Sequence, residues 1–100
     1  MLVAFSVAPS GGSDAGDSVT EAVAEAVRIV RASGLPNRTD AMFTTLEGEL
    51  DECMAVVRDC CDAVARYGTR VSLVLKADIR PGHVGELTAK VDRVEQALRS

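Results

Sequence analysis

The stretch NRTDAMFTTLE, residues 37–47, decides the fold that this sequence predicts. It lies between two segments with helical periodicity, and it is too short to form a capped helix of its own. It is long enough for two brief strands joined by a tight turn, which we place near Ala41 and Met42. The sequence therefore predicts a β-hairpin between two helices.

Apolar residues at helical spacing identify the helices on either side of the hairpin. The first stripe spans residues 19–30, and Ser18 with Glu21 three residues later predicts a capping box at the helix start. Acidic residues begin the second helix, where the helix dipole favours negative charge. Its expected apolar stripe comprises Leu50, Cys53, Met54, Val57, Cys60, Cys61 and Val64.

Two further strands and a third helix complete the predicted elements. Residues 2–8 are apolar apart from Ser6 and end at Pro9, which indicates a short strand. The segment TRVSLVLKADI, residues 69–79, is the strongest strand pattern in the chain. A third helix follows it and carries an apolar stripe of its own, formed by Leu87, Val91, Val94 and Leu98.

The order of elements selects one simple fold. It reads strand, helix, strand, strand, helix, strand, helix, and right-handed crossovers leave the split βαβ, or ferredoxin-like, sheet as the simplest arrangement. We therefore predict an α+β ferredoxin-like sandwich, βαββαβ, with an additional C-terminal helix. Its 100 residues, 1–100, are expected to form a single domain.

Both faces of the predicted sheet are apolar. The first strand presents Val3, Phe5 and Val7 on one side, and Leu2, Ala4 and Ala8 on the other. Because helices would cover only one face, a monomer would expose an apolar patch of a kind that soluble monomers avoid. We expect the chain to self-associate through that face or through the sheet edges, as a homodimer or homotetramer.

Composition argues against several classes of partner and location. The net charge of −4 and the absence of a basic run argue against nucleic-acid binding. The apolar start MLVAFSVAP lacks a charged region and is too short for a signal peptide or a membrane span, so we expect a cytoplasmic protein with no membrane partner.

The sequence predicts neither a metal site nor a cofactor. Three cysteines on one helix are odd in number, so they are expected to stay reduced, and the lone histidine, His83, is too distant to complete a zinc site with them. The segment PSGGSD, residues 9–14, could present amides to a phosphate, but we favour a plain connection because Asp14 and Asp17 would repel an anion.

No enzyme motif is found, and we expect no catalytic residue. His83 lies in a loop and has no evident orienting partner in the sequence, so we favour an exposed side chain over a general base. Four basic residues near strand ends are expected to be solvated, with pairing to a ligand phosphate or to a neighbouring subunit's carboxylate as the alternative; they are Arg38, Arg70, Lys76 and Arg80.

The hairpin is the strongest candidate for a binding site. Its hydroxyls and carboxylates, bordered by Met42 and Phe43, would suit a small cationic or amino-bearing heterocycle. Equally, Thr44 is an ordinary strand residue and Glu47 can cap the following helix. Residue chemistry alone favours neither the binding site nor the purely structural hairpin.

The sequence also resembles a known family. VAFSVAP at the start, SGLPNRTDAMFTTLEGELDE across the hairpin, and VSLVLKADIRPG followed by LTAKVDRVEQAL are together similar to the small thiamine-binding protein family. The resemblance covers residues 2–98. It implies a ferredoxin-like subunit that assembles into dimers and commonly tetramers, and that binds thiamine or its hydroxymethylpyrimidine part rather than catalysing a reaction.

The resemblance and the hairpin pattern together give five candidate ligand-binding residues. Thr44 and Glu47 are supported by both, and Ser6 and Asp40 are added to them. The family has Pro and Gly around the hairpin turn, whereas this chain has Ala41 and Phe43, so Phe43 could fill part of the pocket or stack on the ligand.

Three functions remain open at the level of sequence. The first is a non-catalytic, oligomeric binding protein for thiamine or a hydroxymethylpyrimidine-like compound. The second is a regulatory or structural oligomer that binds another small effector at a subunit interface. The third is a small enzyme, which would need a base such as His83 in a closed cavity.

Overall fold

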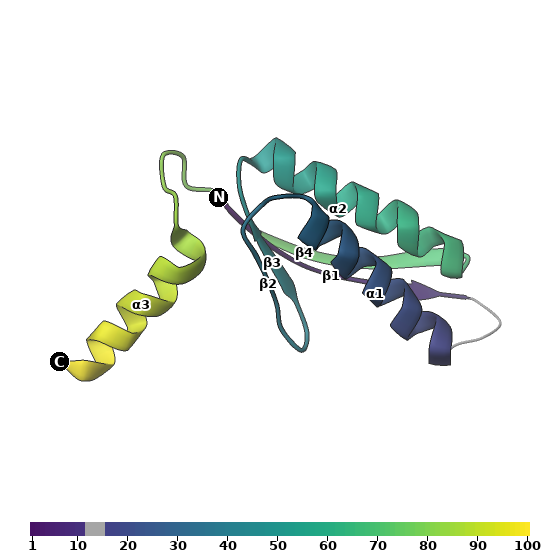
Figure 1. The fold of residues 1–100 in the computed structure, drawn as a ribbon, viewed down its shortest axis with the longest axis horizontal. Helices are drawn as coiled ribbons and strands as arrows, with labels where there is room; N and C mark the ends of the chain where they lie inside the picture. Colours follow the sequence, from purple (N-terminus) through teal and green to yellow (C-terminus); the bar gives the residue numbers. More distant parts are fainter. Residues whose placement is uncertain (12–15) are drawn as a thin grey trace.

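A four-stranded sheet with two helices on one face forms the body of the molecule (Figure 1). The computed structural model describes residues 1–11 and 16–100, with the backbone alone for residues 16–18. In chain order the elements are β1 (Leu2–Ser10), α1 (Gly16–Ala32), β2 (Asn37–Thr39), β3 (Thr44–Glu47), α2 (Leu50–Val64), a 3-10 turn η1 (Ala65–Tyr67), β4 (Arg70–Asp78) and α3 (Glu86–Arg99).

The strand order is β2-β3-β1-β4, and every neighbouring pair is antiparallel. This order and the βαββαβ succession confirm the predicted ferredoxin-like fold with an extra C-terminal helix. The central strand β1 pairs with β4 along all nine of its residues, but with β3 only from Leu2 to Phe5. The second half of β1 therefore has a strand on one side only.

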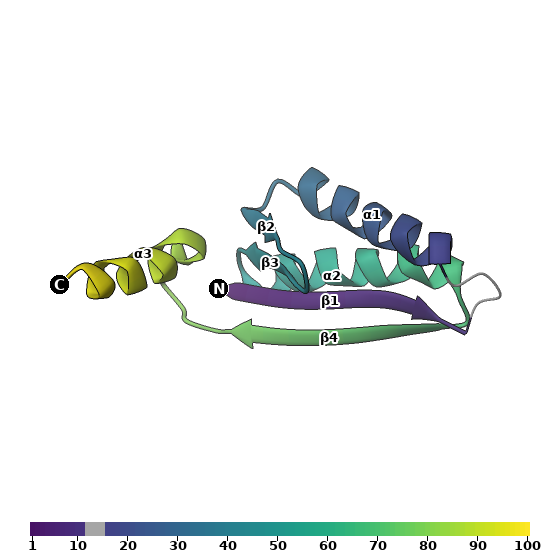
Figure 2. The same ribbon diagram turned by 90° about the horizontal axis from the view of Figure 1, so that it is seen from below.

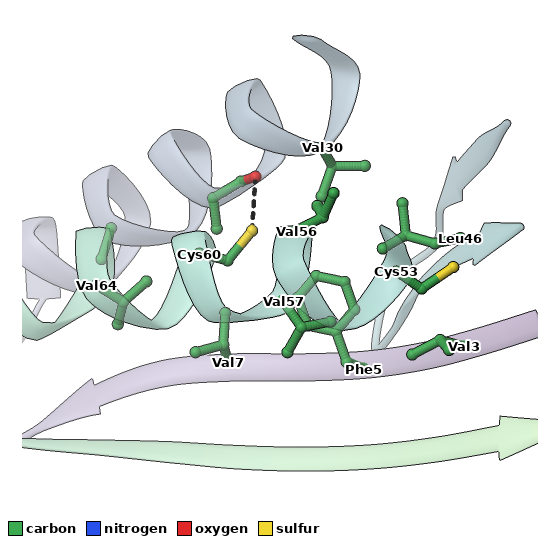
Figure 3. Close-up of a cluster of buried hydrophobic side chains, with 12 residues drawn as sticks. Val3, Phe5, Val7, Val30, Leu46, Cys53, Val56, Val57, Cys60 and Val64 are labelled. Atoms are coloured by element: carbon green, nitrogen blue, oxygen red, sulfur yellow. Dashed lines mark hydrogen bonds between the residues drawn. The ribbon is translucent and has the colours of Figure 1, made fainter. Parts of the chain in front are cut away.

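The core lies between the sheet and the helices α1 and α2 (Figure 3). Alternate β1 residues, Val3, Phe5 and Val7, point into it, as the period of two requires. On α2 the buried side chains include Val56, whereas Met54 is exposed, so the helix is turned about its axis relative to the predicted stripe. Figure 3 shows Val56 directed toward Val30 of α1, which explains this orientation.

The hairpin turn lies where the sequence predicts it. The backbone N–H of Asp40 donates a 2.9 Å hydrogen bond to the carbonyl of Phe43, which leaves Ala41 and Met42 at the tip. Thr39 and Thr44 form the last strand pair before this turn. β2 and β3 are therefore short, with three and four residues.

The start of α1 is only partly described. The helix begins at Gly16, two residues before the predicted start at Ser18. The Ser18 side chain, and with it the predicted capping box, lies outside the described residues. Residues 12–15 also lie outside them, so the alternative of a phosphate site in the Gly-rich loop stays untested.

The third helix, α3, projects away from the sheet along the long axis of the molecule, which measures 52 Å (Figures 1 and 2). Its predicted apolar stripe is largely solvent-exposed: Val91 is 48%, Val94 59% and Leu98 74% exposed. α1 and α2 lie on the same face of the sheet, and the opposite face has no helix over it in Figure 2. Among residues 1–11 and 16–100, no helix is both long and apolar enough to cross a bilayer.

Candidate functional site

A cavity forms where β3 stops short beside β1. Beyond Phe5, β1 pairs only with β4, so alternate backbone groups of residues 6–8 face a space that a longer β3 would fill. The hairpin tip closes one end of that space, and α1 passes over it. The shortness of a four-residue strand thus creates the cavity.

The cavity has a volume of about 190 Å³ and opens to solvent. Three elements line it. β1 contributes Phe5, Ser6, Val7 and Ala8; α1 contributes Val23, Ala26, Val27 and Val30; and the hairpin contributes Thr39, Asp40, Ala41, Met42, Phe43 and Thr44. The wall is therefore mainly apolar, with hydroxyl groups and one carboxylate from the hairpin.

Four of the five predicted site residues meet at this cavity. Ser6, Asp40, Phe43 and Thr44 all line it, although Ser6 lies 34 positions before Asp40 in the chain. The side chain of Thr44 is buried and shares the helix-facing side of the sheet with Phe5, its strand partner. The hairpin and Ser6, at the centre of β1, thus converge on one place.

Asp40 gives the cavity its negative charge. Among the described lining residues it is the only charged one. Its carboxylate is 3.6 Å from the guanidinium of Arg38, and both side chains are exposed, so solvent screens that pair strongly. The carboxylate therefore remains able to attract an amino group at the cavity mouth.

Glu47 lies elsewhere and has intramolecular partners. Its carboxylate accepts hydrogen bonds from the backbone amides of Glu86 (2.8 Å) and Leu87 (3.1 Å), the first residues of α3. Gly85 precedes them with a φ of 71°, in the left-handed region that favours glycine. Glu47 therefore satisfies the free amides of the α3 N-terminus, whereas α2 begins with its own capping box at Glu49 and Glu52.

Ion pairs surround this junction between β3 and α3. The buried Glu86 carboxylate accepts a 2.7 Å hydrogen bond from Arg93, and this bond is the main reason why the pKa of Glu86 is lowered. Lys90 donates to Asp78 at the end of β4 and likewise lowers the pKa of Asp78. The Lys90–Asp78 pair links α3 to the end of β4, whereas the Glu86–Arg93 pair lies within α3.

His83 belongs to the same junction. Its Nδ1 is 3.5 Å from Glu86 and its Nε2 is 3.2 Å from Arg80, two partners that the sequence pattern did not reveal. It does not line the cavity. Its side chain is exposed, as the sequence predicts.

Some cavity residues were not predicted as site residues. Val23 and Val27 were assigned to the core stripe of α1, yet the Val23 side chain is exposed and that of Val27 half-buried at the cavity wall. Helical spacing marks an apolar face but does not say which of its members a neighbouring strand covers. The hairpin also brings Met42 and Thr39 to the cavity wall. The sequence does not specify how far the hairpin turn extends.

The cysteines serve as packing groups. Burial raises the pKa of Cys60 to about 12, and its thiol donates a 3.4 Å hydrogen bond to the carbonyl of Ala26. Cys53 is also buried, and Cys61 half-buried. Within the described ranges, no group of three or more potential ligands is arranged to hold a metal ion.

The family of the chain follows from a comparison with known proteins. Residues 3–95 match the family described as thiamine-binding protein. The chain belongs to this family. A UPF0045 protein of Mycobacterium bovis is 54% identical over 99 residues, covering 98% of this chain and 94% of its own length.

Solved structures of similar proteins share the fold of this family member. The DUF77 domain of Bacillus cereus aligns with a TM-score of 0.79 and 33% identity, covering 90% of this chain and 85% of its own. A hypothetical protein of Methanocaldococcus jannascii aligns with a TM-score of 0.81 and 29% identity, covering 94% of each chain. The βαββαβ arrangement with a C-terminal helix is thus shared with known structures of similar length.

Proposed function

We propose that this thiamine-binding family member is a non-catalytic binding protein that holds the pyrimidine part of thiamine, or a hydroxymethylpyrimidine-like compound, in the cavity beside β1. The observation that carries the proposal is the meeting of Ser6, Asp40, Phe43 and Thr44 at one cavity. The family description supplies the ligand class. Neither a metal nor a cofactor is part of the proposal.

The size of the cavity favours one ring over two. Pockets for drug-sized ligands measure roughly 300–1,000 Å³, whereas this cavity holds about 190 Å³. A pyrimidine ring with its substituents suits such a space, and the remainder of thiamine would extend through the open mouth. Binding would therefore depend mainly on the pyrimidine part.

The proposed contacts follow from the chemistry of the wall. The Asp40 carboxylate would accept hydrogen bonds from the ring's amino group, and the Thr44 hydroxyl would orient the ring. Phe43 at the mouth would pack on the ring, while the valines of α1 cover its other side. Glu47 is left out of the proposed contacts because its carboxylate already binds the start of α3.

Isothermal titration calorimetry tests the proposal with matched variants. Hydroxymethylpyrimidine and thiamine should both bind, and Thr44→Val should weaken binding of each about fivefold, because a typical hydrogen bond contributes about 1 kcal/mol. Thr45→Val makes the same chemical change on the neighbouring strand residue, which does not line the cavity, and should leave affinity unchanged. Absence of heat for both ligands at millimolar concentration would contradict the proposal.

We also propose that the protein acts as an oligomer. The support is the amount of exposed apolar surface, on the α3 stripe and on the strand residues Leu73 and Val74. The same surface favours one alternative function, a regulatory or structural oligomer with another effector at a subunit interface. A thermal-shift screen over a panel of metabolites separates the two, since the alternative requires stabilisation by a compound without a pyrimidine ring.

A further inference from the structure

The second half of β1 leaves backbone hydrogen-bonding groups without a strand on its β3 side. β1 pairs with β3 only from Leu2 to Phe5, because the chain turns away at the hairpin tip. If the same register continued, Met42 would lie opposite Val7, but Met42 belongs to the turn. Past Phe5, this side of β1 therefore borders the cavity instead of a strand.

The hydrogen bonds at the two ends of β1 show which of its residues face this side. At the start, the Met1 nitrogen donates to the Gly48 carbonyl at 3.0 Å, and the Gly48 nitrogen donates back to the Met1 carbonyl at 3.1 Å. At the end, the Ser10 carbonyl accepts a 3.1 Å bond from Thr69, next to β4. Backbone groups alternate along a strand, and the register between β1 and β4 is unbroken, so odd-numbered β1 residues face β3 and even-numbered ones face β4. The N–H and the C=O of Val7 therefore both point to the cavity side.

Val7 is the residue of β1 that offers both a donor and an acceptor there. Beyond Phe5 the odd-numbered residues are Val7 and Pro9, and proline has no N–H. The Val7 side chain points into the core, as Figure 3 shows, so the backbone is the polar part of Val7 at the cavity wall. No described strand pairs with Val7 on this side. Because buried backbone groups are nearly always paired in folded proteins, a ligand that pairs with both groups is favoured.

We infer that the backbone N–H and C=O of Val7 bind the edge of an aminopyrimidine, in place of the strand residue that the short β3 lacks. The N–H would donate to the ring nitrogen beside the amino-bearing carbon, and the C=O would accept from the amino group. The second N–H of the amino group then remains for the Asp40 carboxylate, which lines the same cavity. The inference rests on the proposed function and adds a residue that determines its specificity.

This pairing should distinguish an amino group from an oxo group on the ring. The oxo analogue of hydroxymethylpyrimidine has a C=O and a ring N–H where the amino compound has an NH₂ group and a ring nitrogen. In the same orientation it would place its oxygen against the Val7 carbonyl, and when turned over it would have no amino N–H for Asp40. We expect it to bind about tenfold more weakly or worse.

Amide hydrogen exchange measured by NMR tests the geometry in the free protein and the contact in the complex. Without ligand, the Val7 amide should exchange about tenfold faster or more than the amides of Ser6 and Ala8, which face β4. Saturating hydroxymethylpyrimidine should slow the Val7 amide about tenfold or more. Ala8 is the internal control, because its amide should exchange slowly in both states.

An ester in the backbone provides a second readout. α-Hydroxyisovaleric acid in place of Val7 keeps the side chain and removes the N–H. Calorimetry with hydroxymethylpyrimidine should show an affinity about fivefold lower or less, while the Tm changes little because this N–H has no described strand partner. Lactic acid in place of Ala4 is the matched control. It removes an N–H that faces β4, away from the cavity, and should lower the Tm with no change in affinity.

The outcomes separate this inference from the proposed function. A fast Val7 amide that hydroxymethylpyrimidine slows, together with the loss of affinity in the Val7 ester, supports the inference. Binding heat without either effect overturns the Val7 contact and leaves the proposed function in place. A Val7 amide that exchanges as slowly as its neighbours in the free protein also overturns the contact, because another group then occupies it. Absence of binding heat overturns the proposed function and this inference together.

Discussion

The carboxylate of Glu47 accepts a 2.8 Å hydrogen bond from the backbone amide of Glu86, 39 residues later in the chain. The same carboxylate binds the amide of Leu87 at 3.1 Å. A single side chain at the end of β3 therefore anchors a helix that otherwise extends away from the sheet. The residue that the hairpin pattern marked for ligand binding has a structural role in this chain.

Replacing this carboxylate should loosen α3 without affecting the cavity. Glu47→Gln keeps the shape but turns an NH₂ group toward one helix amide, and losing a hydrogen bond to a charged group costs roughly 1 to 3 kcal/mol. We expect hydrogen exchange of the α3 amides to accelerate about tenfold or more, with ligand affinity unchanged. Glu95→Gln, an exposed change on the same helix, is the control. A loss of ligand binding in Glu47→Gln would instead show that Glu47 belongs to the binding site.

The attachment of α3 should also weaken in acid. Lys90 holds the pKa of Asp78 below its ordinary value of 3.8, and this pair links α3 to β4. Within α3, Arg93 likewise holds the pKa of Glu86 below 4.5, with Arg80 and His83 adding to the effect. A lowered pKa in the folded state means that the stabilisation is complete above the ordinary value and is lost as the pH falls through the lowered one. NMR signals of α3 should therefore shift toward those of a mobile helix below about pH 4, while the core signals persist.

Asp78→Asn provides the comparison for this titration. The variant lacks the carboxylate that binds Lys90, so α3 should already be loosened at neutral pH and should respond less to acid. An acid response of equal size in the variant and the wild type would show that Asp78 is not the group responsible.

Thiol reactivity should follow burial. The pKa values of all three cysteines are raised, mainly by burial, and that of Cys60 reaches about 12. Because the thiolate is the reactive form, native protein at pH 8 should label slowly and only at half-buried Cys61, whereas unfolded protein should label at all three. Mass spectrometry counts the labels. Fast labelling of Cys60 in the native protein would mean that the packing between α1 and α2 is looser than described.

Much of the fold could be predicted from local patterns. The stripe on α1, the Val- and Leu-rich run of β4 and the short hairpin each carry their own period, and together they allow few topologies. The exact buried side of α2 could not be predicted, because Val56 and Met54 both fit an amphipathic helix. Contact with Val30 of α1 determines which of them faces inward.

The site was predictable only in part, for a related reason. Asp40, Phe43 and Thr44 are polar or aromatic groups of the hairpin, to which the hairpin pattern and the family resemblance both direct attention, and Ser6 follows from the resemblance alone. Glu47 fits the same pattern, but its carboxylate binds a backbone amide of α3, which lies far along the chain. The wall formed by Val23 and Val27 depends on β3 being short, and strand length is poorly determined by sequence at the level of single residues.

The most direct test of the account is an NMR titration of the isotope-labelled protein with hydroxymethylpyrimidine. The account predicts chemical-shift changes that cluster at the amides of residues 5–8, 23–30 and 39–44, around the cavity beside β1. Residues of the α3 junction, such as Glu47 and Glu86, should shift little. Saturating ligand that perturbs the junction and leaves the cavity amides unchanged, or that perturbs neither, would contradict it.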